Sequence, residues 1–197
     1  MDKKVIDKLR RIFNNMLNIK HEKLHFVQFI HQEEDCDNPC YSCRSNHLRI
    51  FEDNSNKPPV NIYNHKNCHC FYRDVKSKRV GTISNKEFNS PDVWLSLYGV
   101  LPDYYIKKLD AINKYGWNSR RNFLSTKAPN KMIGGDIYYN YRKILPEKEG
   151  RIWYECDVDY ESGPRNEKRL YYSNDGLMFY SPDHGYETFY FLTTEEQ

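Results

Sequence analysis

Long apolar stretches are missing from this chain of 197 residues. No run approaches the roughly 20 apolar residues that a membrane-spanning helix needs. Residues 1–15 are polar and basic, without the apolar centre of a secretory signal peptide. The sequence therefore predicts no membrane attachment, and a protein that stays inside the cell or leaves it by a route without a conventional leader.

Glycine and proline are also few, at nine residues each, and charge is nearly balanced at +3. Together with 15% aromatic residues, this composition favours folded cores over a disordered chain. Residues 1–89 hold 16 basic and 11 acidic residues, and residues 90–197 hold 14 and 16. Bulk charge does not identify a substrate, because affinity for nucleic-acid phosphate then depends on a local basic cluster.

The C-terminal part alternates in the way that half-buried β-strands do. In residues 151–160 one face carries Ile152, Tyr154, Cys156, Val158 and Tyr160, and the other carries Trp153, Glu155, Asp157 and Asp159. Turn signals at Ser162–Pro164 and Asn174–Gly176 separate this segment from those that follow. We predict antiparallel strands over residues 151–160, 169–173, 177–180 and 187–192.

Helical periodicity dominates before these strands. It predicts an amphipathic helix over residues 4–17, helices over 92–98 and 103–115, and a short helix within 118–128. Residues 24–30 fit either the end of a helix or a short strand, and residues 80–83 fit a strand.

Helices followed by antiparallel strands predict an α+β domain over residues 90–197. A polar passage over 85–91 is the expected joint to a small helical domain over residues 1–89.

Glu155, Arg165, Arg169 and His184 are a candidate active site if they meet on the free face of the sheet. A carboxylate can remove the proton of a ribose 2′-hydroxyl, and a histidine with a pKa of about 6.5 can protonate the leaving 5′-oxygen. Arginine side chains neutralise the charge that develops on the phosphate. By spacing alone, solvated or ion-paired side chains are the more common outcome for such residues.

These residues stand in a longer pattern. Its parts, in chain order, are Leu101-Pro102-Asp103-x-Tyr105-Ile106-x-Lys108, Gly116-Trp117, Gly134-Gly135-Asp136-Ile137, Gly150-Arg151-x-Trp153-x-Glu155-x-Asp157, Tyr160-x-Ser162-Gly163-x-Arg165-Asn166, Arg169, Tyr172-Ser173 and Asp183-His184-x-Tyr186-x-Thr188-Phe189. Over residues 91–192 the pattern resembles the barnase-like family of guanyl-preferring microbial ribonucleases. The resemblance implies a barnase-like α+β fold and an endoribonuclease that uses no cofactor for catalysis.

The resemblance also assigns roles by position. Glu155 matches the general base and His184 the general acid, and Arg165 and Arg169 match arginines that bind phosphate. The remaining matches are Lys108 to a lysine that supports the transition state, Tyr186 to a tyrosine beside the catalytic histidine, and Asp157 to a structural aspartate that orients the arginines. Tyr186 is also an expected substrate-binding residue.

Two departures from the family accompany these matches. The family recognises guanine with a glutamate after the Gly-Gly-Asp-Ile strand, but the expected substrate-binding segment Asn140-Tyr141-Arg142 has Arg142 at that place and Tyr141 where an arginine would bind phosphate. Arginine only donates hydrogen bonds and cannot accept them from guanine, so the resemblance does not extend to base preference. Gly185 is an extra residue between the acid and Tyr186.

Cysteine and histidine gather in the N-terminal part. Two cysteines two residues apart, followed by a distant Cys/His pair, are typical of tetrahedral zinc sites. The sequence predicts structural zinc held by Cys40, Cys43, His65 and Cys68, with Cys70 as the substitute. Disulfides and unbound thiols are the alternatives, and a compartment without a secretory leader argues against disulfides. The histidines expected only at the surface are His21, His25, His31 and His47.

Residues 40–70 also resemble a knuckle of phage minor head morphogenesis proteins, which implies a docking or delivery role. For the whole chain we favour an endoribonuclease of single-stranded RNA that acts as a toxin or effector. A protective inhibitor protein is an expected partner, because free ribonuclease would threaten its host. The alternatives are a catalytically inactive adaptor that binds RNA or protein, and a metal-dependent nuclease using Asp157, Asp159 and His184.

Overall fold

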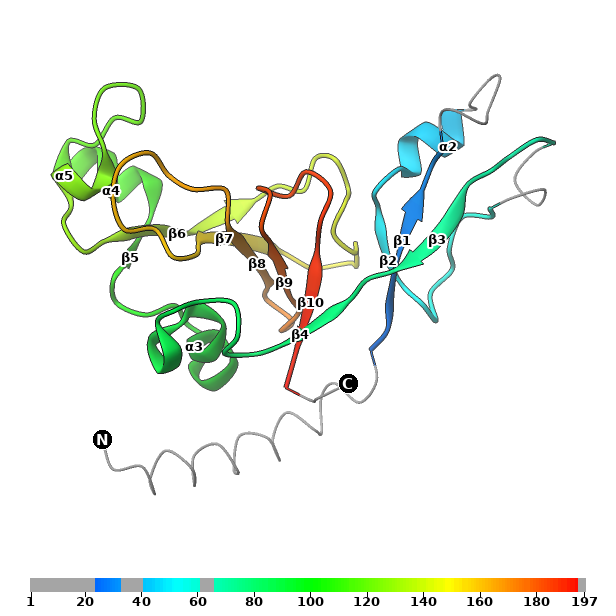
Figure 1. Ribbon diagram of the computed structural model, residues 1–197, viewed down its shortest axis with the longest axis horizontal. Helices are drawn as coiled ribbons and strands as arrows, with labels where there is room; N and C mark the ends of the chain where they lie inside the picture. The colour runs from blue at the N-terminus through cyan, green and yellow to red at the C-terminus, as the bar shows by residue number, and fades with distance from the viewer. Residues whose placement is uncertain (1–23, 33–40, 61–65, 195–197) are drawn as a thin grey trace. The chain divides into compact units, whose positions relative to one another are not determined.

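A computed structural model describes residues 24–32, 41–60 and 66–194 of the chain (Figure 1). It forms two compact units. Unit 1 groups Met1–Val75 with Asn140–Lys148, and unit 2 groups Lys76–Tyr139 with Glu149–Gln197. The helix expected over residues 4–17 and the expected zinc ligands Cys40 and His65 lie outside the described residues.

The described part of unit 1 is a three-stranded antiparallel sheet with one short helix. The strands follow the order β2 (Ile50–Glu52), β1 (Phe26–Ile30) and β3 (Phe71–Asp74), and the helix is α2 (Tyr41–Asn46). Of the two structures expected for residues 24–30, the strand is therefore correct. A helical domain is expected for this part of the chain, but its described residues form three strands and one short helix.

Unit 2 contains a seven-stranded sheet. Its strand order is β4 (Ser77–Arg79), β10 (Tyr190–Thr193), β9 (Met178–Ser181), β8 (Arg169–Ser173), β7 (Trp153–Asp157), β6 (Met132–Tyr138) and β5 (Tyr105–Ile106). The two outermost pairs are parallel and the inner ones antiparallel. Since its helices precede the antiparallel strands, the predicted α+β class is confirmed.

The helices of unit 2 are η2 (Glu87–Asn89), α3 (Pro91–Tyr98), α4 (Lys108–Tyr115) and α5 (Leu124–Lys127). The helix expected over residues 103–115 begins only at Lys108, because Tyr105 and Ile106 pair with Met132 and Ile133 as β5. It ends at Gly116, whose φ of 66° is a left-handed conformation that glycine adopts readily.

Two apolar cores support the sheet. Cys156, Val158 and Leu170 pack with residues of β9, β10 and the loop at Ile83, and burial raises the pKa of the Cys156 thiol. The second core joins α4 and α5 to β6 through Ala111, Leu124 and Ile133 (Figure 1). Glu155 and Asp157 alternate with Cys156 along β7 and so lie on the opposite sheet face, where Asp157 pairs with Arg169 of β8.

The two units divide the chain earlier than residues 89 and 90, where the sequence predicts a boundary. The strand β4 pairs in parallel with β10, so residues 76–89 group with unit 2. This strand covers Ser77–Arg79 and not the expected residues 80–83. Pairing across more than 100 residues leaves no local signal in the sequence, which is why the periodicity does not reveal it.

Within the described ranges, no helix is both long enough and apolar enough to cross a membrane.

Candidate active site

The Gly-Gly-Asp segment of β6 places a carboxylate opposite the expected general base. A Cβ on Gly134 would lie 2.5 Å from the Cβ of Cys156, and Gly135 has a φ of +86°. The strand register shifts between Gly134 and Asp136, which brings Asp136 opposite Glu155 on β7. Glycine is needed at both positions, first for close strand approach and then for the left-handed bulge.

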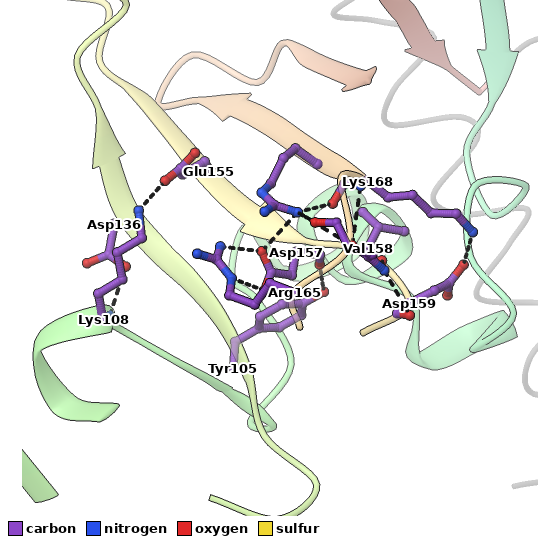
Figure 2. Close-up of polar contacts among 11 residues, drawn as sticks. Tyr105, Lys108, Asp136, Glu155, Asp157, Val158, Asp159, Arg165 and Lys168 are labelled. Carbon is purple, nitrogen blue, oxygen red and sulfur yellow. Dashed lines mark hydrogen bonds and ion pairs between the residues drawn. The ribbon is translucent and has the colours of Figure 1, made fainter. Parts of the chain in front are cut away.

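Asp136 in turn fixes the start of α4. Its Oδ2 accepts a hydrogen bond of 2.9 Å from the backbone N–H of Lys108, the first residue of that helix. A carboxylate at a helix N-terminus satisfies an otherwise unpaired donor and interacts favourably with the helix dipole. The contact thus orients the Lys108 side chain along the sheet (Figure 2).

Lys108 and Glu155 form the first ion pair of the site. The Lys108 Nζ lies 2.5 Å from Glu155 Oε1. The Glu155 side chain is 15% exposed, so its carboxylate is largely shielded while remaining reachable. The ion pair joins the first residue of α4 to the middle of β7.

Asp157, two residues further along β7, holds both arginines. Its Oδ2 accepts from Arg165 Nε at 2.8 Å, and its Oδ1 accepts from Arg165 Nη2 at 2.5 Å (Figure 2). Arg169 Nη1 lies 3.3 Å from the same Oδ1. The Asp157 side chain is fully buried, and the bidentate contact uses one edge of the Arg165 guanidinium and leaves the N–H groups of Nη1 for other partners.

The loop before β8 completes this arrangement. Asn166 donates to the carbonyl oxygens of Val158 and Asp159 at 2.9 and 3.1 Å. The Asn166 carbonyl in turn accepts from Arg169 Nη1 at 2.6 Å. These bonds bend the loop so that Arg165 and Arg169 meet at one carboxylate.

His184 lies in the loop between β9 and β10. Its backbone N–H donates to the Glu167 carbonyl at 2.7 Å, which ties this loop to the one that carries Arg165. Ser181 Oγ accepts from the Gly185 N–H at 2.8 Å and donates to Asp183. His184 and Gly185 have φ values of 59° and 74°, and left-handed backbone at a non-glycine residue is typical of functional loops.

Burial and neighbouring charges both act on the His184 imidazole. Partial burial, followed by the positive charge of Arg169, lowers the pKa of His184 from its usual value, while Glu155 acts in the opposite direction. The Tyr186 ring centroid lies 6.1 Å from that of His184. Unit 2 therefore contains a carboxylate, an imidazole and three cations that match the expected active site.

Comparison with known proteins agrees with this geometry. A family model described as ribonuclease matches residues 101–192. A ribonuclease from Heyndrickxia coagulans is 45% identical over 96 residues, which cover 49% of this chain and 86% of that protein. The chain belongs to the ribonuclease family. Ribonucleases from Bacillus intermedius and Bacillus pumilus are likewise 45% identical over 96 residues, and the match covers 58% of each of them.

Membership of the ribonuclease family confirms the predicted resemblance to barnase-like enzymes and the predicted class of enzyme. The matched residues lie almost wholly in unit 2. The family model therefore covers the expected active-site residues Lys108, Glu155 and His184.

Three of the four expected substrate-binding residues belong to unit 1, whereas Tyr186 belongs to unit 2 with Glu155 and His184. Asn140 has a φ of 48° and closes a short loop: its side chain accepts from the Leu145 N–H at 3.1 Å and donates to the Leu145 carbonyl at 2.9 Å. Tyr141 is 85% exposed, and Arg142 is exposed as well. Their roles in binding RNA remain predictions.

Sequence reasoning did not assign roles to three residues that organise the ribonuclease site. These are Asp136, which caps α4, Tyr105, whose hydroxyl donates to the Asp157 carbonyl at 2.5 Å, and Asp183. Although burial opposes it, hydrogen bonds from Ser181 and the Thr188 backbone lower the pKa of Asp183. All three residues lie within the family pattern, but only the fold shows which residues they contact.

The carboxylates of the metal-dependent alternative have other partners. Asp157 holds the two arginines, while Asp159 accepts from the Ser84 hydroxyl at 2.6 Å and lies 3.3 Å from Lys168 Nζ. These cationic and hydroxyl partners occupy the oxygens that a metal ion would need. In this structure the two carboxylates therefore bind arginine, lysine and serine side chains.

Unit 1 contains a group that could hold a metal ion. His31, Cys43 and Cys70 are buried, and one ligand atom from each lies within 4.8 Å of the others. The Sγ atoms of Cys43 and Cys68 are 3.9 Å apart. The expectation that His31 lies at the surface is wrong, since it is 7% exposed.

Proposed function

We propose that this chain cleaves single-stranded RNA by acid–base transesterification without a metal ion. In the first step the Glu155 carboxylate takes the 2′-hydroxyl proton, the 2′-oxygen bonds to phosphorus, and His184 gives a proton to the departing 5′-oxygen. The products are a 2′,3′-cyclic phosphate and a free 5′-hydroxyl. The observation that carries this proposal is the set of ion pairs that joins Lys108 to Glu155 and Asp157 to both arginines. Arg169 and Glu155 of this set also influence the pKa of His184.

In the second step water opens the cyclic phosphate and yields a 3′-phosphate. The two groups exchange roles: His184, now neutral, accepts the proton of water, and protonated Glu155 returns a proton to the 2′-oxygen. No net proton is gained or lost by the protein over both steps, which is the balance that repeated turnover requires.

Lys108, Arg165 and Arg169 are proposed to stabilise the negative charge on the phosphate during both steps. Arg165 and Arg169 are already oriented by Asp157, so little rearrangement is needed when the substrate binds. Preorganised cations of this kind contribute more in a shielded site than in water.

The test uses short fluorogenic RNAs, each carrying one of the four bases, with EDTA present. We expect Glu155→Gln and His184→Ala to lower kcat/KM by about 10²–10⁴-fold, the usual contribution of general acid–base catalysis. Glu161→Gln is the control, since residue 161 is exposed. Full activity in His184→Ala, or loss of wild-type activity in EDTA, would contradict the mechanism.

The same RNAs report base preference. We propose that the guanine preference of the family is weakened, because Arg142 offers donors only and cannot accept the hydrogen bonds of guanine N1 and N2. A ranking with guanine far above the other bases would refute this part of the proposal and leave the mechanism intact.

We propose further that the enzyme acts as a toxin or effector and is restrained by a protein inhibitor. The cluster of Lys108, Arg165 and Arg169 favours an inhibitor with an acidic surface, because opposite potentials accelerate and orient association. Pull-down from the source cell with inactive His184→Ala protein as bait should recover it. Harmless expression of the active enzyme, with no protein recovered, would contradict a restrained toxin.

Finally, we propose that unit 1 binds a structural zinc ion that takes no part in catalysis. The buried thiols and imidazole of this unit supply the soft and borderline donors that zinc prefers in structural sites.

A further inference from the structure

The segments of unit 1 that carry its buried cysteines are short and far apart in sequence. Cys43 lies on α2, a helix of six residues, and isolated helices of this length are not stable in water. Cys68 and Cys70 precede β3, and His31 follows β1. Small units with few apolar residues usually need a disulfide or a metal ion to hold such segments together.

We infer that a zinc ion is held by His31, Cys43, Cys68 and Cys70. This inference rests on the structural zinc proposed above and replaces two of the ligands expected from spacing alone. It assigns a ligand role to His31, which lies outside the Cys-x-x-Cys motif and the Cys/His pair that predict the site.

Distances between the donor atoms agree with a tetrahedral site. With Zn–S bonds of about 2.3 Å and Zn–N bonds of about 2.0–2.1 Å, two sulfur ligands lie about 3.8 Å apart and a sulfur and a nitrogen about 3.6 Å apart. The observed separations are 3.9 Å for Cys43 Sγ to Cys68 Sγ and 3.5 Å for Cys70 Sγ to His31 Nδ1. The ligand atoms of His31, Cys43 and Cys70 all lie within 4.8 Å of one another, and Cys68 Sγ adjoins this group through its contact with Cys43 Sγ.

The surroundings of His31 are also unlike those of a surface histidine. The residue is 7% exposed, and its Nδ1 atom faces the Cys70 sulfur at 3.5 Å. A buried imidazole needs partners for its ring nitrogens, and a metal ion at Nδ1 would be one of them.

The position of the ligands shows what the metal would do. Cys43, Cys68 and Cys70 form one apolar core with Phe29 of β1. One ion would therefore join the end of β1, the helix α2 and the segment before β3. Because a preformed site is absent in unfolded chains, metal binding would stabilise the folded form of unit 1.

The experiment measures metal bound to the full-length protein after purification in reductant and dialysis against buffered zinc. We expect about one zinc per chain, and on cobalt substitution the ligand-field bands of a tetrahedral site with a thiolate-to-cobalt charge-transfer absorption. His31→Ala should lower zinc affinity by more than about 100-fold, since even changes behind the ligands cost 10–100-fold. His31→Cys should keep the metal and strengthen the charge-transfer absorption.

Matched controls separate ligand loss from general damage. His25→Ala removes another histidine next to β1 that is exposed and pairs with Asp53 and Asp74, and Cys156→Ser removes a buried thiol of unit 2. Both variants should bind zinc as the wild type does. RNA cleavage is recorded throughout, because it reports the folding of unit 2 independently of the metal.

Each outcome decides a separate point. Absence of zinc from the wild-type protein with intact RNA cleavage would overturn the zinc site and leave the ribonuclease proposal standing. Full zinc binding by His31→Ala would overturn the ligand set. Retention of zinc in Cys68→Ser together with its loss in Cys40→Ser would move the fourth position to Cys40.

Discussion

Asn in place of Asp157 tests how the ribonuclease site is held together. Asp157 is fully buried and contacts the guanidinium groups of Arg165 at 2.5 and 2.8 Å and of Arg169 at 3.3 Å. Asp157→Asn keeps the shape of the side chain but removes its charge and turns one acceptor into a donor. It therefore leaves two arginines, 21% and 3% exposed, without their counter-charge.

The magnitude follows from burial. Removing one partner of a buried ion pair costs about 3–5 kcal/mol, against a total unfolding free energy of about 5–15 kcal/mol for typical proteins. For a protein of this size each kcal/mol changes Tm by roughly 2–4 °C, so we expect a decrease of roughly 6–20 °C. Urea unfolding monitored by tryptophan fluorescence measures the same loss as a lower midpoint with an unchanged slope.

The matched control is Asp110→Asn, which breaks an exposed pair with Lys114 on α4. Screened surface pairs add little to stability, so its midpoint should equal that of the wild type. A loss below about 0.5 kcal/mol in Asp157→Asn, the range of ordinary surface substitutions, would show that the buried carboxylate does not hold the arginines as described.

Two further predictions concern His184 and Gly185, in the loop between β9 and β10. Partial burial and Arg169 lower the pKa of His184. Because cleavage needs the protonated imidazole, kcat/KM for RNA cleavage should fall as pH rises through a value below 6.5. Hydrolysis of the cyclic phosphate needs the neutral imidazole, so its rate should rise over the same pH range. Separate pH profiles of the two steps measure this, and a cleavage limb above pH 6.5 would contradict it. Gly185→Ala should cost about 1–3 kcal/mol in urea unfolding, because its φ is +74° and its Cβ would lie 2.6 Å from the Tyr171 hydroxyl oxygen. Gly163→Ala has the same backbone strain but nothing within 4 Å, so an equal loss in both variants would rule out the clash.

Much of unit 2 follows from local patterns. The strand expected over residues 169–173 matches β8, and the tight Asn-Asp-Gly turn that follows it defines its C-terminal end. The helix expected over 92–98 matches α3 within one residue, with proline at its start and Gly99 at its end. Here short-range signals and tertiary structure agree.

Long-range pairing accounts for most differences. Tyr105 and Ile106 continue an apparent helical period, yet they pair with β6, which lies 27 residues further along the chain. Pairing of β4 with β10 likewise depends on contacts that no window of sequence contains. Such hydrogen bonds override weak helical propensity, because they satisfy backbone groups that would otherwise be buried unpaired.

The two candidate sites differ in how far their residues can be identified from the sequence. Glu155, His184 and both arginines are identified by resemblance to the ribonuclease family, because each matches a position in an ordered pattern. His31 has no such pattern, and only the fold brings it to Cys70. A ligand contributed from a distant strand cannot be identified from the spacing of cysteines.

The segment Asn140–Lys148 makes the two units inseparable by a single cut in the chain. It follows β6 of unit 2, belongs to unit 1, and leads back to β7. Within unit 1 the Ile50 N–H donates to the Ile144 carbonyl at 2.6 Å, and Arg49 pairs with Glu147 at 3.0 Å. A shortened protein that begins at Lys76 would keep every catalytic side chain named above, yet the loop between two of its central strands would lose these partners. Minimal ribonucleases made by N-terminal deletion would therefore differ from the parent in that loop, and would be poor standards for its substrate preference.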